Sequence, residues 1–330
     1  MNYQFNCTEN YGYLISKVYG KELLLLTEQD YKTLNQCENI EEFCIKLSRT
    51  YRYISEDMDH TKNELKRRLN KTLIDEYNEC KKENDSLLSV ILDYYIENHE
   101  IHNFFFLLQS KHNDPDLDKA FQKIEIGNFD ALKTLKFCKD MHDVQKYCVE
   151  NSFLKKYFYK VKWAPEFKDN DFQKYQALFL KYHVEDAYTN LSQYGLFIQD
   201  ILKTEADRYI IDLTINTISS KEIVGPERKK LFPRIYSLDT KTVDELSNSE
   251  SIDDIKSTLN DKYNFNKDIY TELISRELKK YSESFKIHND ISCVYSYLRL
   301  REQEIKNILW IVECVLQDRR QEIDHLILIN

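Results

Sequence analysis

The sequence predicts an all-α fold made of three quasi-repeated helical units. The first observation behind this prediction is a shortage of turn residues, since the 330 residues include only five Gly and four Pro. Average usage in a chain of this length would give on the order of 23 Gly and 16 Pro. Such a shortage favours long helices with few connections over a many-stranded fold.

The second observation is a short motif that recurs along the chain. Residues 100–105 (EIHNFF) match residues 304–309 (EIKNIL), and residues 206–211 (ADRYII) stand midway between them. Three copies of a motif about 100 residues apart indicate three related units of about 110 residues each. We therefore predict helical units at 1–115, 116–223 and 224–330, with the N-terminal helices packed against the C-terminus.

Capping residues indicate where individual helices begin. Thr27 with Asp30 three residues later, Asn39, and Asp116 each have the pattern of a first helical turn. The longest predicted helices cover residues 61–80, 85–111, 171–202, 204–221, 267–287 and 291–324.

Polar or proline-containing stretches separate these helices. Breaks are expected at residues 111–116, 162–171, 224–233 and 246–254. Within the third break, Pro226 and Pro233 flank a short segment. Because a proline lacks an amide donor and crowds the preceding turn, this segment is predicted to be a fixed loop.

The last predicted helix carries an apolar stripe. One buried face is marked by apolar residues at helical spacing, namely Ile305, Ile308, Leu309, Val312 and Leu316. Trp310 lies off this stripe, so the helix is expected to be buried on more than one side. We predict that Trp310 is a core anchor, whose replacement by Ala would cost about 3–5 kcal/mol if the ring is fully buried.

The composition argues against several functional classes. A formal net charge of -9 is unsuited to nucleic acid, whose phosphates require a basic surface. The five glycines are too far apart for a phosphate-binding loop, and no nucleophile motif is present. No apolar run reaches the roughly 18 residues of a membrane span, and the first residues lack a signal-peptide pattern. We expect a cytosolic chain without a catalytic site, a cofactor or direct membrane insertion.

Three histidines in one region of the sequence are candidate metal ligands. His99, His102 and His112 lie close together in the sequence but lack the spacing of zinc-binding motifs. Half-buried helix histidines are the simpler interpretation. Eight Cys without a Cys-x-x-Cys pair are expected to be reduced thiols. No metal site is predicted.

Two marks of the repeat contain clusters of polar residues. These candidate contact residues are Glu205, Asp207, Arg208, Arg301, Glu302, Gln303, Glu304, Lys306 and Asn307. One interpretation is a solvated helix face with ion pairs worth about 0.2–0.5 kcal/mol each. The other is a polar layer between helical units or a contact surface for a partner. If the carboxylates of Glu302 and Glu304 are exposed, replacing either by Ala changes stability by less than about 1 kcal/mol.

At these residues the sequence resembles the d subunits of vacuolar-type ATPases, a family related to the funnel-shaped C subunit of archaeal and bacterial rotary ATPases. The most specific match is residues 301–314 (REQEIKNILWIVEC). Further matches in the family's order are 12–14 (GYL), 30–31 (DY), 36–38 (QCE), 205–208 (EADR), 213–216 (LTIN) and 230–233 (KLFP). Tyr53, Tyr209, Lys306 and Leu328 depart from the family's pattern.

The resemblance implies a funnel-like socket of three helical units on the cytoplasmic face of vacuolar or other endomembranes. It implies contacts with the proteolipid c-ring, with the central-stalk subunits D and F, and with subunit a. The implied function is non-catalytic: passing torque from the central shaft to the ring that carries protons. A cytosolic helical scaffold or adaptor unrelated to the pump is the alternative that helical periodicity alone allows.

Two cysteines lie in family-matching segments near opposite ends of the chain. Cys37 and Cys314 form a candidate thiol pair if the N-terminal helices pack on the last helix. Two unrelated reduced thiols are the alternative, which a cytosolic location favours.

Overall fold

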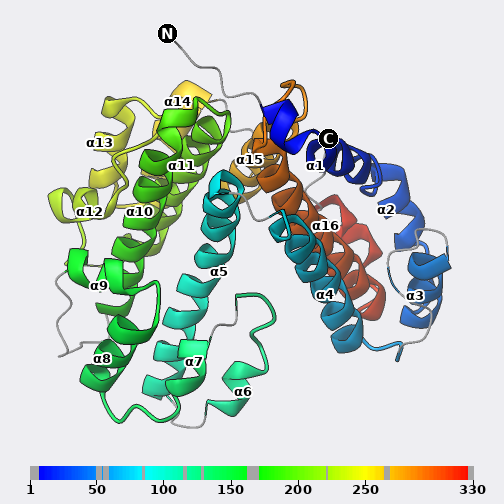
Figure 1. Cartoon of the computed structure of the whole chain (residues 1–330), viewed down its shortest axis with the longest axis horizontal. Helices are drawn as coiled ribbons and strands as arrows, with labels where there is room; N and C mark the ends of the chain where they lie inside the picture. Colours follow the sequence, from blue (N-terminus) through cyan, green and yellow to red (C-terminus); the bar gives the residue numbers. More distant parts are fainter. Residues whose placement is uncertain are drawn as a thin grey trace. The chain divides into compact units, whose positions relative to one another are not determined.

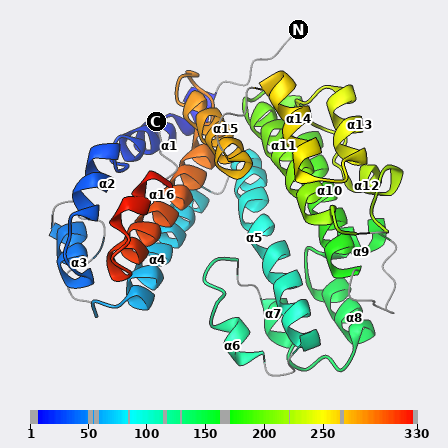
Figure 2. The same ribbon diagram turned by 180° about the vertical axis from the view of Figure 1, so that it is seen from behind.

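A computed structural model describes residues 7–49, 54, 59–83, 86–113, 117–127, 130–161, 171–220, 222–263 and 268–325. Over these ranges the chain forms sixteen α-helices and two 3-10 helices, and no strand occurs in them (Figures 1 and 2). The predicted all-α class is confirmed. No helix among the described residues is long and apolar enough to cross a bilayer.

The helix bounds follow the chain order. The first eight α-helices are α1 (Cys7–Glu22), α2 (Glu28–Asn35), α3 (Ile40–Arg49), α4 (Lys62–Lys81), α5 (Ser86–Asn113), α6 (Asp118–Phe121), α7 (Asp130–Thr134) and α8 (Met141–Asn151). The second eight are α9 (Lys155–Val161), α10 (Asp171–Leu191), α11 (Ile198–Thr217), α12 (Pro226–Leu231), α13 (Thr240–Asn248), α14 (Ile252–Tyr263), α15 (Ile269–Ser284) and α16 (Ser292–Leu316). The 3-10 helices are η1 (Ser192–Tyr194) and η2 (Arg320–His325).

The predicted helix starts are confirmed where the structure describes them. Thr27 caps α2 in a reciprocal capping box with Asp30. Asn39 precedes α3 and accepts a hydrogen bond from the amide of Glu42 at 2.9 Å. Asp116 lies outside the described residues. Side-chain caps of this kind are local, and they depend only on residues three or four positions apart.

Two predictions about helix continuity are wrong. The segment between Pro226 and Pro233 is not a loop, because residues 226–231 form α12 with Pro226 in its first turn. A proline is tolerated there since the first-turn amides have no partner within the helix. The predicted helix 171–202 is also interrupted, by η1 and by Gly195 in the left-handed region at φ +63°. Glycine adopts this conformation without the steric penalty of a side chain, and it ends the helical run.

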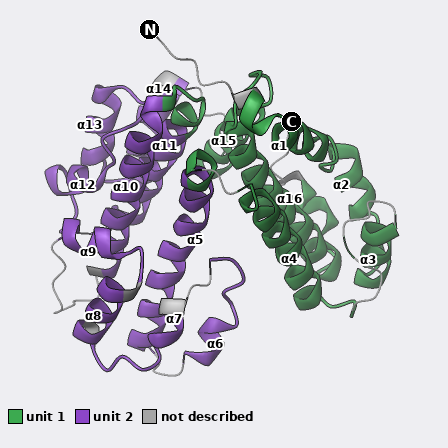
Figure 3. Cartoon of the chain, viewed as in Figure 1, with its two compact units in different colours: residues 1–89, 194–201, 267–330 green, residues 90–193, 202–266 purple. Residues whose placement is uncertain are grey.

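The helices divide between two compact units, drawn green and purple in Figure 3. Unit 1 consists of residues 1–89, 194–201 and 267–330, and unit 2 of residues 90–193 and 202–266. The predicted division into three units is based on a repeated sequence motif, whereas these two units are defined by compactness. The three-unit division therefore stays a prediction.

Helix α16 is the centre of unit 1. It contacts α1, α2, α3 and α4 from the N-terminal part of the chain, and α15 and η2 from the C-terminal part (Figures 1 and 2). With neighbours on several sides, most of its residues are buried, from Ser292 to Val315. Polar residues on this helix must therefore find partners inside the protein.

Unit 2 is built on an aromatic core. Phe179 of α10 is fully buried, and its ring centroid lies 5.2 Å from that of Phe105 on α5. The rings of Phe158 and Tyr157 on α9 approach Phe179 at 5.3 and 5.5 Å. These tilted and edge-to-face contacts are the favoured packing of aromatic side chains, and they join three helices.

Candidate functional site

The polar segment of α16 lies inside unit 1. Arg301, Glu302, Gln303, Glu304 and Asn307 are buried, whereas Lys306 is exposed. Of the two interpretations, the solvated helix face is wrong for these carboxylates, since Glu302 is 7% and Glu304 0% exposed. The reason is tertiary: elements from both ends of the chain surround α16. This segment is therefore an internal scaffold of unit 1.

Glu304 joins α16 to the turn between α1 and α2. One carboxylate oxygen accepts a hydrogen bond from the backbone amide of Leu26 at 2.5 Å. The other accepts from Nη1 of Arg301 at 2.5 Å. Hydrogen bonds that involve an ionised group are about twice as strong as neutral ones. Leu26 is itself buried, so Glu304 supplies an acceptor to an amide that is shielded from water.

The contacts of Arg301 extend to two further helices. Its Nε lies 3.4 Å from a carboxylate oxygen of Glu76 on α4. On α1, Lys21 lies 3.7 Å from Glu76 and 2.8 Å from Glu79, and Lys17 lies 2.5 Å from Glu79. We call this set the α16 network, comprising Lys17, Lys21, Glu76, Glu79, Arg301 and Glu304. It links α1, α4 and α16.

Burial divides the carboxyls of the α16 network into two kinds. Burial raises the pKa of Glu304 to about 7 and that of Glu76 to about 7 because it disfavours the charged form. Hydrogen bonds from Lys17 and Lys21 lower the pKa of the more exposed Glu79 to about 2. Two of the three carboxyls thus have a raised pKa, and the third has a lowered one.

Glu302 and Gln303 have separate partners. Arg299 donates to Glu302 at 2.9 Å, and its Nε also donates to the hydroxyl of Tyr281 on α15 at 3.3 Å. Gln303 donates its side-chain amide to Asn307 one turn later at 3.0 Å. Helix α15 is thereby connected to α16 by polar contacts as well as by packing.

The middle motif on α11 has the same internal role in unit 2. Glu205 is buried and accepts a hydrogen bond from the hydroxyl of Tyr94 on α5 at 2.9 Å. Asp207 accepts from the backbone amides of Ser237 and Leu238 at 2.8 and 3.1 Å. Arg208 lowers the pKa of Asp212, which burial raises more strongly. Glu205 and Asp207 thus fix a helix and a loop to α11.

A buried histidine completes this arrangement, and sequence reasoning missed it. His183 on α10 has Nε2 at 3.1 Å from the carbonyl oxygen of Tyr94 and Nδ1 at 2.8 Å from the hydroxyl of Tyr157. A carbonyl can only accept, so Nε2 carries the proton and Tyr157 donates to Nδ1. Burial lowers the pKa of His183 to about 3. We call Tyr94, Tyr157, His183 and Glu205 the His183 network.

Glu97 lies beside the His183 network. Its carboxylate is 3.5 Å from Nδ1 of the neutral His183 and is paired with Lys156 at 3.0 Å. Burial raises the pKa of Glu97, and Lys156 opposes that shift.

Arg228 on α12 is a second residue that sequence reasoning missed. Its side chain is fully buried. It donates to the carbonyls of Ser247 and Ser249 at 2.9 and 2.8 Å and to that of Thr217 at 3.1 Å. These carbonyls lie at the ends of α13 and α11, where helix dipoles favour a cation. The proline-flanked segment therefore positions a buried helix cap.

Trp310 is not a core anchor. Its side chain is 38% exposed, and its Nε1 donates to the carbonyl of Glu322 in η2 at 3.2 Å. The ring lies on the side of α16 that faces the short C-terminal 3-10 helix, which covers only part of it. Trp310 attaches η2 to α16, while Ile308 and Ile311 are fully buried.

The candidate thiol pair is not bonded. Cys37 and Cys314 are both buried free cysteines, and burial raises the pKa of each. A raised thiol pKa lowers the fraction of reactive thiolate. Of the two alternatives, the structure therefore has two separate thiols and no bridge.

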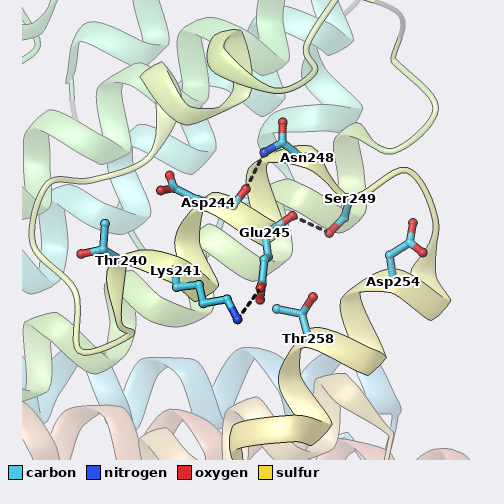
Figure 4. Close-up of a pocket in the computed structure, with 8 residues that line it drawn as sticks. All are labelled: Thr240, Lys241, Asp244, Glu245, Asn248, Ser249, Asp254 and Thr258. Carbon is cyan, nitrogen blue, oxygen red and sulfur yellow. Dashed lines mark hydrogen bonds and ion pairs between the residues drawn. The ribbon is translucent and has the colours of Figure 1, made fainter.

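Two cavities lie among the described residues. A groove of about 750 Å³ lies at α13 and α14 (Figure 4). Each carboxylate of the groove already has a partner. Asp244 forms an ion pair with Lys229, and Glu245 forms one with Lys241. Asp254 accepts hydrogen bonds from the backbone amides of Glu250 and Ser251. A cavity of about 330 Å³ is lined by Thr134, Phe137, Cys138, Asp143, Lys146, Tyr147 and Glu150. Across the part of the chain that the structure describes, no group of His, Cys, Asp or Glu is arranged to hold a metal ion.

Comparison with known proteins identifies the family of this chain. The family model for the ATP synthase (C/AC39) subunit matches residues 14–326, a span that includes α16 and α11. The chain belongs to this family. Like the vacuolar-type d subunits that the sequence resembles, the C/AC39 family is a family of non-catalytic subunits.

Relatives of the C/AC39 family match along nearly their whole length. The chain is 28% identical to V-type proton ATPase subunit d2 of Arabidopsis thaliana over 333 residues, covering 94% of each chain. It is 25% identical to V-type proton ATPase subunit d of Dictyostelium discoideum, covering 98% of this chain and 96% of the relative. It is 24% identical to the subunit d of Saccharomyces cerevisiae, covering 96% of both.

Proposed function

We infer that the chain is subunit d of a V-type proton-pumping ATPase, a non-catalytic subunit of its V0 sector. The observation that carries this conclusion is the match over at least 94% of the chain to relatives bearing that name. The described structure is consistent with it, because the polar motifs hold helices together and the carboxylates of the groove at α13 and α14 are already paired.

The proposed mechanical task is to couple the central shaft to the proteolipid c-ring, so that ATP hydrolysis elsewhere drives proton transport. Close-packed helical interiors have low compressibility and transmit strain. The α16 network and the His183 network support this task because each fixes several helices by polar contacts. The proposed shape is a funnel-like socket of three helical units.

The proposed partners are the c-ring, the central-stalk subunits D and F, and subunit a. The proposed location is peripheral, on the cytoplasmic face of vacuolar or other endomembranes. The absence of a spanning helix among the described residues supports attachment through protein partners.

Affinity purification tests this function. The tagged full chain is expressed in its source cells, membranes are solubilised in a mild detergent, and captured proteins are identified by mass spectrometry. We expect the proteolipid and the shaft subunits in stoichiometric amounts. A tagged cytosolic helical protein of similar size serves as the control.

A second measurement connects assembly to transport. Membrane vesicles from cells depleted of the chain should lose ATP-driven proton uptake, and re-expression should restore it. Recovery of the chain with other proteins but without ATPase subunits, together with normal proton uptake after depletion, would establish the scaffold or adaptor alternative instead.

A further inference from the structure

Helix α4 carries a run of cations in its first half. The cations among residues 62–71 are Lys62, Lys66, Arg67, Arg68 and Lys71, and Glu64 is the carboxylate in this range. The chain as a whole has a net charge of -9. Charged residues on the outer face of a helix are ordinarily solvated, but such a face normally mixes both signs. The excess of one sign therefore needs a separate explanation.

The stability of α4 does not explain these cations. Lys62 is the first residue of α4, where the helix dipole favours an anion. Cations four positions apart on a helix also repel each other, and this applies to Lys62 with Lys66 and to Arg67 with Lys71. Both effects disfavour the run within the isolated helix, so its explanation lies outside α4.

Contacts inside unit 1 account for part of the run. Lys62 pairs with Glu313 of α16. Arg67 donates through Nε and Nη2 to the two carboxylate oxygens of Glu64 at 2.7 and 2.6 Å, and Nε of Arg68 donates to the same group at 2.7 Å. Two guanidinium groups thus share one carboxylate, and they lower the pKa of Glu64 to about 2. Nη1 of Arg67 is still able to donate to a further acceptor.

The outer face of α4 presents Arg67 and Lys71 to solvent. Helix α4 contacts α16 (Figures 1 and 2), and its inward side chains are buried, among them Leu65, Leu69 and Leu73. Positions 67 and 71 project from the opposite side of the helix. The Arg67 side chain is 56% exposed, and Lys71 is also exposed. Within the described residues, no carboxylate pairs with Lys71.

Two neighbouring exposed cations match the carboxylates of a partner. We propose that Arg67 and Lys71 form the centre of a docking surface for an acidic segment of another subunit of the pump. A carboxylate between them would accept from both cations, as Glu64 accepts from Arg67 and Arg68. Complementary charge of this kind selects the partner and its orientation. This inference rests on the proposed function, because it takes the partner from the same complex.

Other anionic partners fit this surface less well. Nucleic acid is disfavoured by the net charge of -9. Attachment to a lipid surface usually combines cations with apolar side chains that enter the bilayer interface. In the part of the chain that the structure describes, the large exposed apolar side chains lie on other elements than α4. An acidic polypeptide is therefore the partner that this surface matches.

Carbodiimide coupling in the captured complex tests the proposal. The reagent joins a lysine amine directly to a carboxylate in ion-pair contact with it, so Lys71 reports on what covers this surface. The tagged full chain is captured from solubilised membranes, coupled, digested and analysed by mass spectrometry. We expect Lys71 to be linked to an Asp- or Glu-containing segment of another ATPase subunit.

Variants at Arg67 show whether the two cations act together. Arg67→Gln removes one cation without adding a carboxylate, and we expect the yield of the Lys71 link to fall at least about threefold. Arg67→Lys keeps the charge and should retain the yield within about twofold. The matched control is Lys82→Gln, which removes an exposed cation just after the end of α4 and should leave the yield unchanged. If Arg67→Gln does not fold, the coupling pattern of the unmodified chain decides.

Three outcomes would overturn the docking surface. These are a Lys71 that couples to no other subunit, an equal yield in Arg67→Gln and the unmodified chain, and binding of the isolated chain to phosphatidylserine vesicles that Arg67→Gln weakens. Each of them leaves the proposed function intact as long as ATPase subunits are captured. Capture without any ATPase subunit would instead refute the proposed function.

Discussion

The two units bury their polar side chains in different ways. Unit 1 buries charged groups around α16, whereas unit 2 buries a neutral histidine with two tyrosines and one carboxylate around α10 and α11. In unit 1, burial raises the pKa of Glu304 and Glu76 into the neutral range. In unit 2, burial lowers the pKa of His183 far below that range. Burial thus gives opposite shifts because one group is charged when deprotonated and the other when protonated.

These shifts give the two units opposite responses to acid. A raised carboxyl pKa adds stability that is fully present below pH 4.5 and is lost as pH rises through about 7. A lowered histidine pKa adds stability that is present above pH 6.5 and is lost as pH falls toward about 3. Mild acidification from pH 7 therefore strengthens the α16 network and weakens the His183 network.

The largest effect is expected when the α16 network of unit 1 loses a buried cation. Arg301→Met removes the shared cation of Glu304 and Glu76, and we expect a loss of about 3–5 kcal/mol in the free energy of unfolding at pH 7.5. The loss should shrink at pH 6, since both carboxyls then take up protons. Urea denaturation at the two pH values measures it. The control Lys17→Met, at a part-exposed pair, should cost much less. An equal loss at both pH values would contradict this account.

The next prediction tests the His183 network of unit 2. His183→Phe removes the donor to the Tyr94 carbonyl and the acceptor of the Tyr157 hydroxyl, and we expect a loss of about 1–3 kcal/mol at pH 7.5. Below pH 6.5 this histidine takes up a proton in the unfolded chain but not in the folded one. Through His183, the unmodified chain should therefore lose roughly 2 kcal/mol in the free energy of unfolding between pH 6.5 and pH 5.

The His183→Phe variant should lack this part of the acid sensitivity. Urea denaturation at pH 7.5 and pH 5 measures the difference between the variant and the unmodified chain. The exposed His142 supplies the control His142→Phe, which should retain the acid sensitivity. If both variants lose the same stability between the two pH values, His183 does not carry the response.

A smaller effect concerns the loop that α11 holds. Asp207→Asn keeps one oxygen acceptor for the amides of Ser237 and Leu238 but removes its charge, and we expect a loss of about 1 kcal/mol. Asp207→Ala removes the acceptor and should cost about 1–2 kcal/mol, with faster hydrogen exchange at residues 237 and 238. Unchanged exchange in both variants would show that the loop is held by other contacts.

The smallest effect concerns Trp310. With its ring 38% exposed, Trp310→Ala should lower the free energy of unfolding by about 1 kcal/mol. The substitution removes less buried apolar area than one in the core, and it leaves no enclosed cavity. The matched control two residues earlier is Ile308→Ala, at a fully buried position, which should cost about 2–5 kcal/mol. Thermal melts distinguish the two variants. A larger loss for Trp310→Ala would reverse the assignment of core and edge on this helix.

Local signals were predictable from the sequence, and tertiary ones were not. The starts of α2 and α3 follow from Thr27 and Asn39, because a cap depends on residues within one turn. The burial of Glu304 depends on elements that lie more than 200 positions away in the chain. Periodicity assigns polar residues to the surface, so it could not indicate that this carboxylate has internal partners.

The same limit explains the errors at Trp310 and at α12. The exposure of Trp310 depends on how much of the ring η2 covers, which its position in the helical pattern does not reveal. Proline rules were applied correctly to the interior of a helix, but Pro226 occupies the first turn, where they do not hold. Nothing in the local sequence of Arg228 indicates that two helix ends converge on its side chain.

The beginning of α11 has a consequence for synthesis of the chain. The amides of Phe197 and Ile198 donate to Asp290 and to the hydroxyl of Ser292, which lie 93 and 94 positions later. At translation rates of about 5–20 residues per second, these acceptors leave the ribosome roughly 5–20 seconds after the amides that need them. Until then, water or a chaperone must satisfy the first turn of α11, and a truncated chain that ends before residue 290 would never complete it.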